Sequence, residues 1–362
     1  MASAPLVIAP NAFKGTLSAT AAAAAMVRGL ERVHPDRPRF VCPLPDGGDG
    51  TLEVLAARLN ATPQQTVVTT ADGMPRAIPF ALWEARRGPV ALIESAAVTG
   101  LPVAGAEASM RTTRGLGEWI TQLLDRGVRR FCVGLGGSAT WDAGTGMLAA
   151  LGARFDGNGD PRPAHLAAVR RVCVSALDPR LKDCRWTILV DVNNPLLGAD
   201  GAALYARQKG VDAAALPAWD AAIAHVAGQL EQSVRRGLVS SPGAGAAGGL
   251  GFAFAFLGAR LLPGAPFLAR LAGLDRAIAA SAAVFTGEGA CDRQTAAGKG
   301  PRVVADLAAR HGRPAIVICG RIDPSFAVVQ SRFSQSVALM PAANAADAVA
   351  DAVEWVLRQG HF

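Results

Sequence analysis

Short apolar runs that each end in a polar, glycine-containing loop are the feature that most restricts how this chain can fold. Leu6-Val7-Ile8-Ala9 is the first run, and a loop from Pro10 to Leu17 follows it. Ser18 is then a suitable N-cap for a helix whose apolar residues recur at the helical period. A second run, Phe40-Val41-Cys42, ends in the loop Pro45 to Gly50. This order predicts a parallel α/β sheet with functional loops at the carboxyl ends of its strands.

The C-terminal third repeats this pattern, and the middle of the chain differs. Further short strands are predicted at Val284-Phe285-Thr286, Ala315 to Cys319 and Val337-Ala338-Leu339. Between the two ends lie strand-like alternation near residues 66–83 and a helical pattern from Thr113 to Arg126. We therefore predict one α/β domain built from residues 1–62 plus 280–362, with a second α/β domain, 63–279, inserted into it.

Composition excludes several classes of protein. The chain has 362 residues, of which 51% are hydrophobic and 18% charged, as expected for a soluble globular protein with a sizeable core. No apolar stretch suits a membrane span, and the N-terminus lacks the pattern of a secretion signal. Six cysteines form no CxxC pair, so we expect buried, reduced thiols and a cytoplasmic location.

The charge pattern favours a small anionic ligand over nucleic acid. The net charge is +7, but the basic residues are scattered and do not alternate with aromatics. Among 36 Lys plus Arg residues only Lys14, Lys182, Lys209 and Lys299 are lysines, and all but Lys182 precede glycine. A lysine kept in so arginine-rich a chain indicates a place that needs a compact ammonium, although chance is an alternative.

Two loops near the N-terminus carry candidate chemistry. Lys14 follows the first strand and precedes a helix, where an anion site is favourable. The alternative is a solvated loop lysine. In Pro45 to Thr51, Asp46 and Asp49 lie among three glycines and are suited to Mg²⁺ or to base catalysis. Asp49 has a simpler interpretation as a helix N-cap.

Three later segments also follow predicted strands. Gly134 to Thr140 is a glycine-rich turn with hydroxyls before a helix, which is typical of a phosphate cradle, although no Walker A sequence occurs. Asp191 ends the apolar strand at 188–190. The loop from Gly287 to Gly300 holds Glu288, Asp292 and Lys299, which are hard to explain by packing.

Gly243 to Gly248 matches GxGxxG, but its surroundings disfavour a dinucleotide site. Ser240-Ser241-Pro242 precedes it where a strand is required, and the nearest downstream acid is Asp275. We predict instead a loop that closes on a ligand, followed by a helix from Leu250.

Taken in order, these segments resemble the type I glycerate kinase family. The matching motifs, from about residue 6 to about residue 320, are IAPNAFKGTLSA, PLPDGGDGT, GLGGSATWDAGTGMLAALG, DVNNPLLGADGA, YARQKG, GAGAAGGLG and TGEGACDRQTAAGKG. The resemblance implies ATP and Mg²⁺, D-glycerate as acceptor, and phosphoglycerate, usually the 2-phosphate, as product. It also implies two α/β domains, one Rossmann/flavodoxin-like with a parallel sheet, and a site in the cleft between them.

The sequence departs from the family pattern at two positions. Asn11 lies where relatives often have Asp, so we give position 11 no metal role. Trp141 lies where they often have Asn, which alters the expected pocket wall beside Asp142.

The candidate residues divide by expected role, because phosphoryl transfer mainly needs positioning and charge neutralisation. Asp46, Asp49 and Asp191 remain alternatives for both the base and the metal ligand, and Asp292 suits either role. Our assignments are catalytic Lys14, Asp46, Asp191 and Asp292; nucleotide-binding Gly136, Gly137, Ser138, Thr140, Gly287, Glu288, Gly289 and Lys299; substrate-binding Asn11, Lys209, Gln294 and Thr295; and magnesium-binding Asp49 and Asp191.

Three other functions remain open at this stage. One is a kinase for another small hydroxy acid, and another is a non-enzymatic anion sensor on the same scaffold. The third, an NAD-linked reductase, rests only on the GxGxxG match. We expect a monomer or homodimer with no nucleic-acid or membrane partner.

Overall fold

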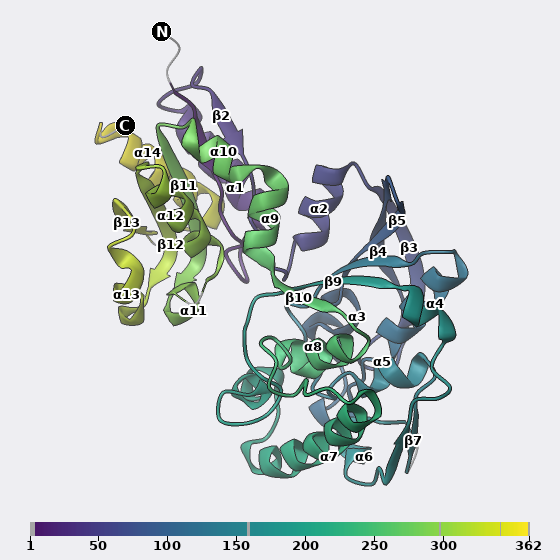
Figure 1. Ribbon diagram of the computed structural model, residues 1–362. Helices are drawn as coiled ribbons and strands as arrows, with labels where there is room; N and C mark the ends of the chain where they lie inside the picture. The colour runs from purple at the N-terminus through teal and green to yellow at the C-terminus, as the bar shows by residue number, and fades with distance from the viewer. Residues whose placement is uncertain (1–3, 158–159, 297, 341, 361–362) are drawn as a thin grey trace. The chain divides into compact units, whose positions relative to one another are not determined.

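The computed structural model describes residues 4–157, 160–296, 298–340 and 342–360, apart from the side chains of Gln294 and Ala296. The chain forms two compact units (Figure 1). Unit 1 comprises Met1–Val54 and Gly264–Phe362, and unit 2 comprises Leu55–Pro263. The chain therefore passes between units after Val54 and after Pro263, where the sequence placed boundaries at 62/63 and 279/280.

Unit 1 contains the parallel sheet that the sequence predicts from both chain ends. Its described strands run in the order β13-β12-β11-β1-β2, and every neighbouring pair is parallel. Their bounds are β1 (Leu6–Ile8), β2 (Arg39–Val41), β11 (Ala283–Cys291), β12 (Ala315–Ile322) and β13 (Gln335–Ala338). This confirms the parallel α/β fold class.

The strand order of unit 1 reverses between β1 and β11. From β1 the chain proceeds to β2 on one side, whereas β12 and β13 extend the sheet on the other side of β11. Ligands of such open sheets bind outside the carboxyl ends of the strands at this reversal. Beyond β1 the chain continues beside β11, because the Asn11 N–H donates to the Gly287 carbonyl at 2.8 Å.

Helices cover the sheet of unit 1. Ser18 caps α1 (Ala19–Glu31) by accepting a 3.1 Å hydrogen bond from the Ala21 N–H, as the sequence predicts. Helix α1 lies beside α14 (Ala345–Arg358), and a Cβ on Gly29 would lie 2.2 Å from the Ala350 carbonyl oxygen (Figure 1). The remaining helices of unit 1 are α9 (Gly264–Ala272), α10 (Leu274–Ala279), α11 (Arg293–Ala296), α12 (Gly300–Arg310) and α13 (Ala327–Gln330), with a 3₁₀ turn at Pro324–Phe326.

Unit 2 is built on a mixed sheet with described strands in the order β10-β9-β6-β5-β4-β3. The alternating segment near residues 66–83 forms the antiparallel pair β3 and β4, and β5, β6, β9 and β10 continue in parallel. A separate antiparallel pair joins β7 and β8. The bounds are β3 (Thr62–Thr69), β4 (Pro75–Ala85), β5 (Gly88–Glu94), β6 (Arg130–Gly134), β7 (Arg154–Asp156), β8 (Arg171–Cys173), β9 (Arg185–Val190) and β10 (Arg260–Pro263).

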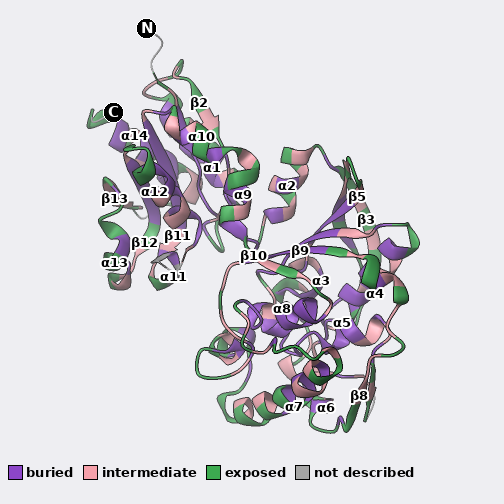
Figure 2. Ribbon diagram, viewed as in Figure 1, coloured by how far each residue is buried: buried purple, intermediate pink, exposed green. Residues whose placement is uncertain are grey.

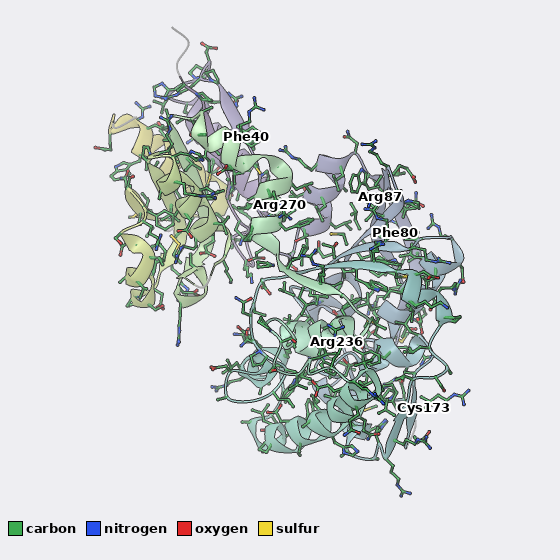
Figure 3. The ribbon with its side chains drawn as sticks, in the orientation of Figure 1. Phe40, Phe80, Arg87, Cys173, Arg236 and Arg270 are labelled. Carbon is green, nitrogen blue, oxygen red and sulfur yellow. A yellow bond between two sulfur atoms is a disulfide. The ribbon has the colours of Figure 1, made fainter. Side chains whose placement is uncertain are left out.

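Aromatic side chains fill much of the core of unit 2. The Phe80 ring on β4 (labelled in Figure 3) meets buried Trp119 edge-on at 5.9 Å between centroids. Phe131 stacks on Trp186 at 4.4 Å between centroids. Buried residues also line α8 (Figure 2). Helix α2 (Thr51–Leu59) crosses from unit 1 into unit 2. The other helices of unit 2 are α3 (Ala96–Thr99), α4 (Arg114–Asp125), α5 (Thr145–Ala150), α6 (Pro163–Leu166), α7 (Leu216–Val234) and α8 (Ala246–Phe256). Single 3₁₀ turns span Leu101–Val103, Ala108–Met110, Pro179–Asp183, Ala202–Tyr205, Arg207–Lys209 and Ala213–Ala215.

The cysteines correct one expectation. Cys291 and Cys319 form a disulfide with 5.9 Å between their Cα atoms, so these two thiols are not reduced. Cys173 and Cys184 form no disulfide but are only half-buried, and Cys42 and Cys132 form no disulfide and are buried as expected. The disulfide depends on β11 and β12 being neighbours in space, and spacing along the chain does not show this. No helix within the described residues is long and apolar enough to cross a membrane.

Candidate active site

Unit 1 holds a cluster of buried polar side chains at the point where its strand order reverses. Asn11 follows β1, Glu288 lies in β11, and Lys299 is the N-cap of α12. Asn11, Asp46 and Glu288 are each 4% exposed, Thr295 is fully buried, and Lys299 is 8% exposed. The Asn11 amide donates to Asp46 Oδ2 at 3.0 Å. Burying a polar side chain costs free energy unless it is hydrogen-bonded, so such a cluster is expected where the groups pair with one another or with a ligand.

Glycines bring the loops of this cluster close together. A Cβ on Gly289 would lie 3.0 Å from the Lys14 backbone nitrogen. A Cβ on Gly264 would lie 2.0 Å from the Asp46 carbonyl oxygen. Any larger residue at position 264 would therefore displace the segment that carries Asp46.

Glu288 has the most perturbed environment in the cluster. Burial raises the pKa of Glu288 to about 7, and the nearby Asp46 and Asp292 charges act in the same direction. The Thr295 hydroxyl donates to Glu288 Oε1, and this bond and the Lys299 charge oppose the rise in pKa. Thr295 Oγ1 also accepts the Asp292 N–H at 3.0 Å. A carboxyl group in this setting can exchange a proton near neutral pH.

Unit 2 contains the predicted glycine-rich turn directly after β6. Gly136 is buried, and Gly137 has φ of +78°, a conformation that favours glycine. The Ser138 and Thr140 hydroxyl oxygens are 2.9 Å apart. Asp191 is half-buried just beyond β9. It lies at the same edge of the sheet as the glycine-rich turn, because Gly134 of β6 pairs with Leu189 of β9.

A buried carboxylate, Asp142, anchors the end of this turn. It accepts hydrogen bonds from the Thr113 N–H at 2.9 Å, the Thr113 hydroxyl at 2.8 Å and the Gly144 N–H at 2.9 Å. Burial raises the pKa of Asp142, and these hydrogen bonds oppose the rise. Asp142 therefore connects the turn to the start of both α4 and α5.

Lys209 lies against the same turn from the 3₁₀ turn Arg207–Lys209. Its ammonium donates to the Ser138 carbonyl at 2.7 Å and to the Thr140 carbonyl at 2.9 Å. Burial lowers the pKa of Lys209 to about 7, the Asp142 and Asp191 charges oppose this change, and Arg111 reinforces it. The prediction that Lys209 binds substrate remains a prediction, and its observed partners are backbone carbonyls.

The GxGxxG segment has a packing role in this unit. Helix α7 and a turn precede it, and its last residues form the kinked start of α8. A Cβ on Gly248 would lie 2.0 Å from the Thr140 carbonyl oxygen, and the Gly248 carbonyl accepts the Ala143 N–H at 3.0 Å. These glycines let α8 approach the glycine-rich turn.

The predicted residues therefore form two groups. Lys14 and Asp49 in unit 1 are exposed, and the Gln294 side chain lies outside the described part of the chain. Unit 1 holds Asn11, Lys14, Asp46, Asp49, Gly287, Glu288, Gly289, Asp292, Thr295 and Lys299, and unit 2 holds Gly136, Gly137, Ser138, Thr140, Asp191 and Lys209.

Three residues of unit 2 gain a place in the site that the sequence analysis did not give them. Arg111 donates to the Ala139 and Lys209 carbonyls at 3.2 and 2.6 Å. Nothing in the sequence distinguishes it from the other arginines, because it follows no predicted strand. Asp142 and Thr113 also belong to the site. The sequence could have suggested Asp142, because this Asp lies close to the glycines of the turn. Trp141 packs in the core, 5.6 Å from Trp219 between centroids.

The donor set suits a hard cation only in part. No group of three or more His, Cys, Asp or Glu side chains within the described residues forms a ready-made metal site. Mg²⁺ commonly uses one or two carboxylates together with water and substrate phosphates. Asp191, which follows β9 beside the glycine-rich turn, is a carboxylate that fits a metal shared with a phosphate ligand.

Comparison with known proteins gives one consistent result. The model of the Glycerate kinase family matches residues 6–361. The chain is 37% identical to glycerate 2-kinase of Escherichia coli K12, covering 90% of this chain and 87% of that protein. It is 37% identical to glycerate kinase of Bacillus subtilis 168, covering 93% and 91%.

A solved structure agrees over the whole length. The crystal structure of putative glycerate kinase 2 from Salmonella typhimurium LT2 aligns with a TM-score of 0.78 and 32% identity, covering 99% of each chain. Because family model, relatives and structure all span nearly the entire sequence, this chain belongs to the glycerate kinase family and phosphorylates glycerate.

Proposed function

We propose that this kinase transfers a phosphoryl group from ATP to the 2-hydroxyl of D-glycerate, with Mg²⁺, in the cytoplasm. Family membership supports ATP as the donor. The observation that carries the residue assignment is the buried cluster around Glu288 in unit 1. Its position at the reversal of strand order is where open α/β sheets bind their ligands.

Glu288 is the proposed proton acceptor for the glycerate hydroxyl. A base works best when its pKa lies near the working pH, and burial gives Glu288 a pKa of about 7. This assignment changes the role that the sequence analysis gave Glu288, which was nucleotide binding. Lys299 supplies a positive charge beside it, which neutralises negative charge on the substrates.

The glycine-rich turn of unit 2 is the proposed phosphate cradle. Backbone N–H groups and hydroxyls of such a turn bind phosphate oxygens. We assign this role to Gly136, Gly137 and the Ser138 and Thr140 hydroxyls, because the Ala139 and Thr140 N–H groups donate within the protein. Asp191 is the proposed carboxylate for Mg²⁺, which would neutralise phosphate charge when bound. Asp142 keeps the turn in place and does not meet substrate.

The first experiment defines the reaction. Purified protein is incubated with ATP, Mg²⁺ and D-glycerate, and the product is identified by ³¹P and ¹³C NMR. We expect 2-phosphoglycerate, with no turnover in EDTA. The 3-phosphate as product would refute the regiochemistry, and full activity in EDTA would refute the metal. A panel of other small hydroxy acids tests whether glycerate is preferred.

The second experiment tests the base. Glu288→Gln should lower kcat by about 10²- to 10⁴-fold, the usual contribution of a general base. In the wild type, kcat should rise with pH through about 7, because the carboxyl must ionise to accept a proton. That rise should vanish in the variant. Asp36→Asn, an exposed carboxylate of the same unit, is the control. An unchanged kcat in Glu288→Gln would exclude Glu288 as the base.

A further inference from the structure

The turn of unit 2 presents three consecutive backbone carbonyls to two cations. The Ser138 and Thr140 oxygens accept hydrogen bonds from the Lys209 ammonium at 2.7 and 2.9 Å. The Ala139 oxygen between them accepts from Arg111 Nη1 at 3.2 Å. Arg111 Nη1 also donates to the carbonyl of Lys209 at 2.6 Å, so the two cationic residues are joined.

These contacts fix the orientation of individual peptide groups. The C=O and N–H of one trans peptide point in opposite directions. The peptide between Ser138 and Ala139 is held at both ends, by Lys209 at its carbonyl and by the Thr99 carbonyl at its N–H, at 2.7 Å. In the next peptide, Arg111 holds the carbonyl and the Ser138 hydroxyl accepts the Thr140 N–H at 3.2 Å.

The cations use their donors on the protein itself. Arg111 Nε donates to the Ala104 and Ala106 carbonyls at 3.0 Å each, and Arg111 is half-buried. Lys209 is 7% exposed and gives two of the three N–H donors of its ammonium to the turn. Burying an ammonium is unfavourable unless such partners are present.

We propose that Lys209 and Arg111 together form a carbonyl clamp that holds the turn at residues 138–140 in the shape needed to bind phosphate. They are positioning residues, because they act on the reaction through the backbone that they hold. This inference rests on the proposed role of the turn as the phosphate cradle. It gives Lys209 a different role from the contact with glycerate that the sequence predicts.

The clamp and a direct glycerate contact predict different kinetics. Lys209→Met keeps the length of the side chain and removes the ammonium. If the clamp shapes the phosphate cradle, this change should raise the KM for ATP and lower kcat, each by roughly 10- to 100-fold, as expected for a misplacement of about 1 Å. The KM for glycerate should change less than about twofold. A selective rise in the KM for glycerate would overturn the proposal and favour direct contact.

The pH dependence separates the clamp from packing. Asp142, Asp191 and Arg111 are the charged groups that act on Lys209, whose pKa lies at about 7. The ammonium form, which gives the carbonyls charge-assisted hydrogen bonds, therefore predominates below pH 7 and declines as pH rises. The ratio of wild-type to variant kcat/KM for ATP should be largest at pH 6 and shrink toward pH 9, and the titration of ATP cancels in this ratio. A ratio that is constant with pH would mean a packing role only.

Control and companion variants complete the test. Lys182→Met, an exposed lysine in Pro179–Asp183, should leave kcat and both KM values unchanged. Arg111→Met removes the other cation and leaves Lys209 in place, so it decides the matter if Lys209→Met does not fold. Arg111→Lys should recover part of the loss in Arg111→Met. An inactive wild type would refute the proposed function, whereas an active wild type with unaltered clamp variants would refute only the clamp.

Discussion

Replacing Glu288 by glutamine tests the electrostatics of unit 1 without any assumption about catalysis. The carboxyl is 4% exposed, and burial raises its pKa from 4.5 to about 7. The amide of glutamine has nearly the same shape and keeps an oxygen that can accept the Thr295 hydrogen bond. It cannot ionise, so any difference between the two proteins in how stability depends on pH arises from the ionisation of Glu288.

The sign and size of the effect follow from linkage. Between pH 4.5 and about 7 the folded protein holds a proton that the unfolded chain has released, so the free energy of unfolding falls as pH rises. The stabilisation is complete below pH 4.5 and is lost above about pH 7. A rise in pKa of this size corresponds to about 3 kcal/mol. Glu288→Gln should avoid this loss and be more stable than the wild type at pH 8.

Thermal and denaturant unfolding at pH 5 and pH 8 provide the assay. The Tm of Glu288→Gln minus that of the wild type should increase by on the order of 5 to 10 °C from pH 5 to pH 8. The reason is that about 1 kcal/mol moves Tm by about 2–4 °C in a domain of this size. Asp36→Asn should show no such growth. If wild type and Glu288→Gln follow the same pH dependence, Glu288 is ionised in the folded protein well below pH 7, and its proposed role as a tuned base loses its basis.

Three further predictions concern other parts of the molecule. Asp191→Asn should lose most of kcat with an unchanged circular dichroism spectrum, whereas exposed Asp49→Asn should cost little; near wild-type kcat in Asp191→Asn would make Asp191 peripheral. Lys299→Arg should lower kcat/KM by up to about a hundredfold at unchanged Tm, because a planar guanidinium displaces the bound group. The control, Lys182→Arg at an exposed position, should leave kcat/KM unchanged, and equal behaviour of the two variants would refute a point-charge role for Lys299. Dithiothreitol should lower the Tm of the wild type and not that of Cys291→Ser, since a disulfide between cysteines 28 residues apart contributes about 3 to 4 kcal/mol; a wild-type Tm that ignores dithiothreitol would exclude this contribution.

Local sequence patterns predicted the elements that depend on local interactions. The helix expected from Thr113 to Arg126 is α4 (Arg114–Asp125), and the helix expected after Ser18 is α1 (Ala19–Glu31). Periodicity and an N-cap residue are sufficient for such elements, because they arise from contacts within one or two turns. The loops at strand ends were predicted for the same reason.

These local patterns did not predict contacts between residues that lie far apart in the sequence. The Lys209 ammonium meets a carbonyl 71 residues away, and Arg111 meets one 98 residues away. The disulfide likewise needs β11 and β12 to be neighbours. Lysine scarcity identified Lys209 and Lys299, the two buried lysines, but it did not reveal their partners. It also selected Lys14, which is exposed.

The glycine-rich motifs show how a correct signal can be given an incomplete interpretation. Glycine lets another backbone approach closely, and the sequence analysis took the approaching group to be a ligand. In several places it is the protein itself. Gly248 of the GxGxxG segment faces the Thr140 carbonyl, and Gly264, which the sequence analysis did not single out, faces the Asp46 carbonyl. In each case 2.0 Å separates a Cβ built on the glycine from the oxygen. These glycines therefore place the segments that carry the candidate site residues. An alanine at either position would push the facing backbone away. Gly264→Ala would therefore displace Asp46, and Gly248→Ala would displace the phosphate cradle, although neither change removes a group that meets substrate.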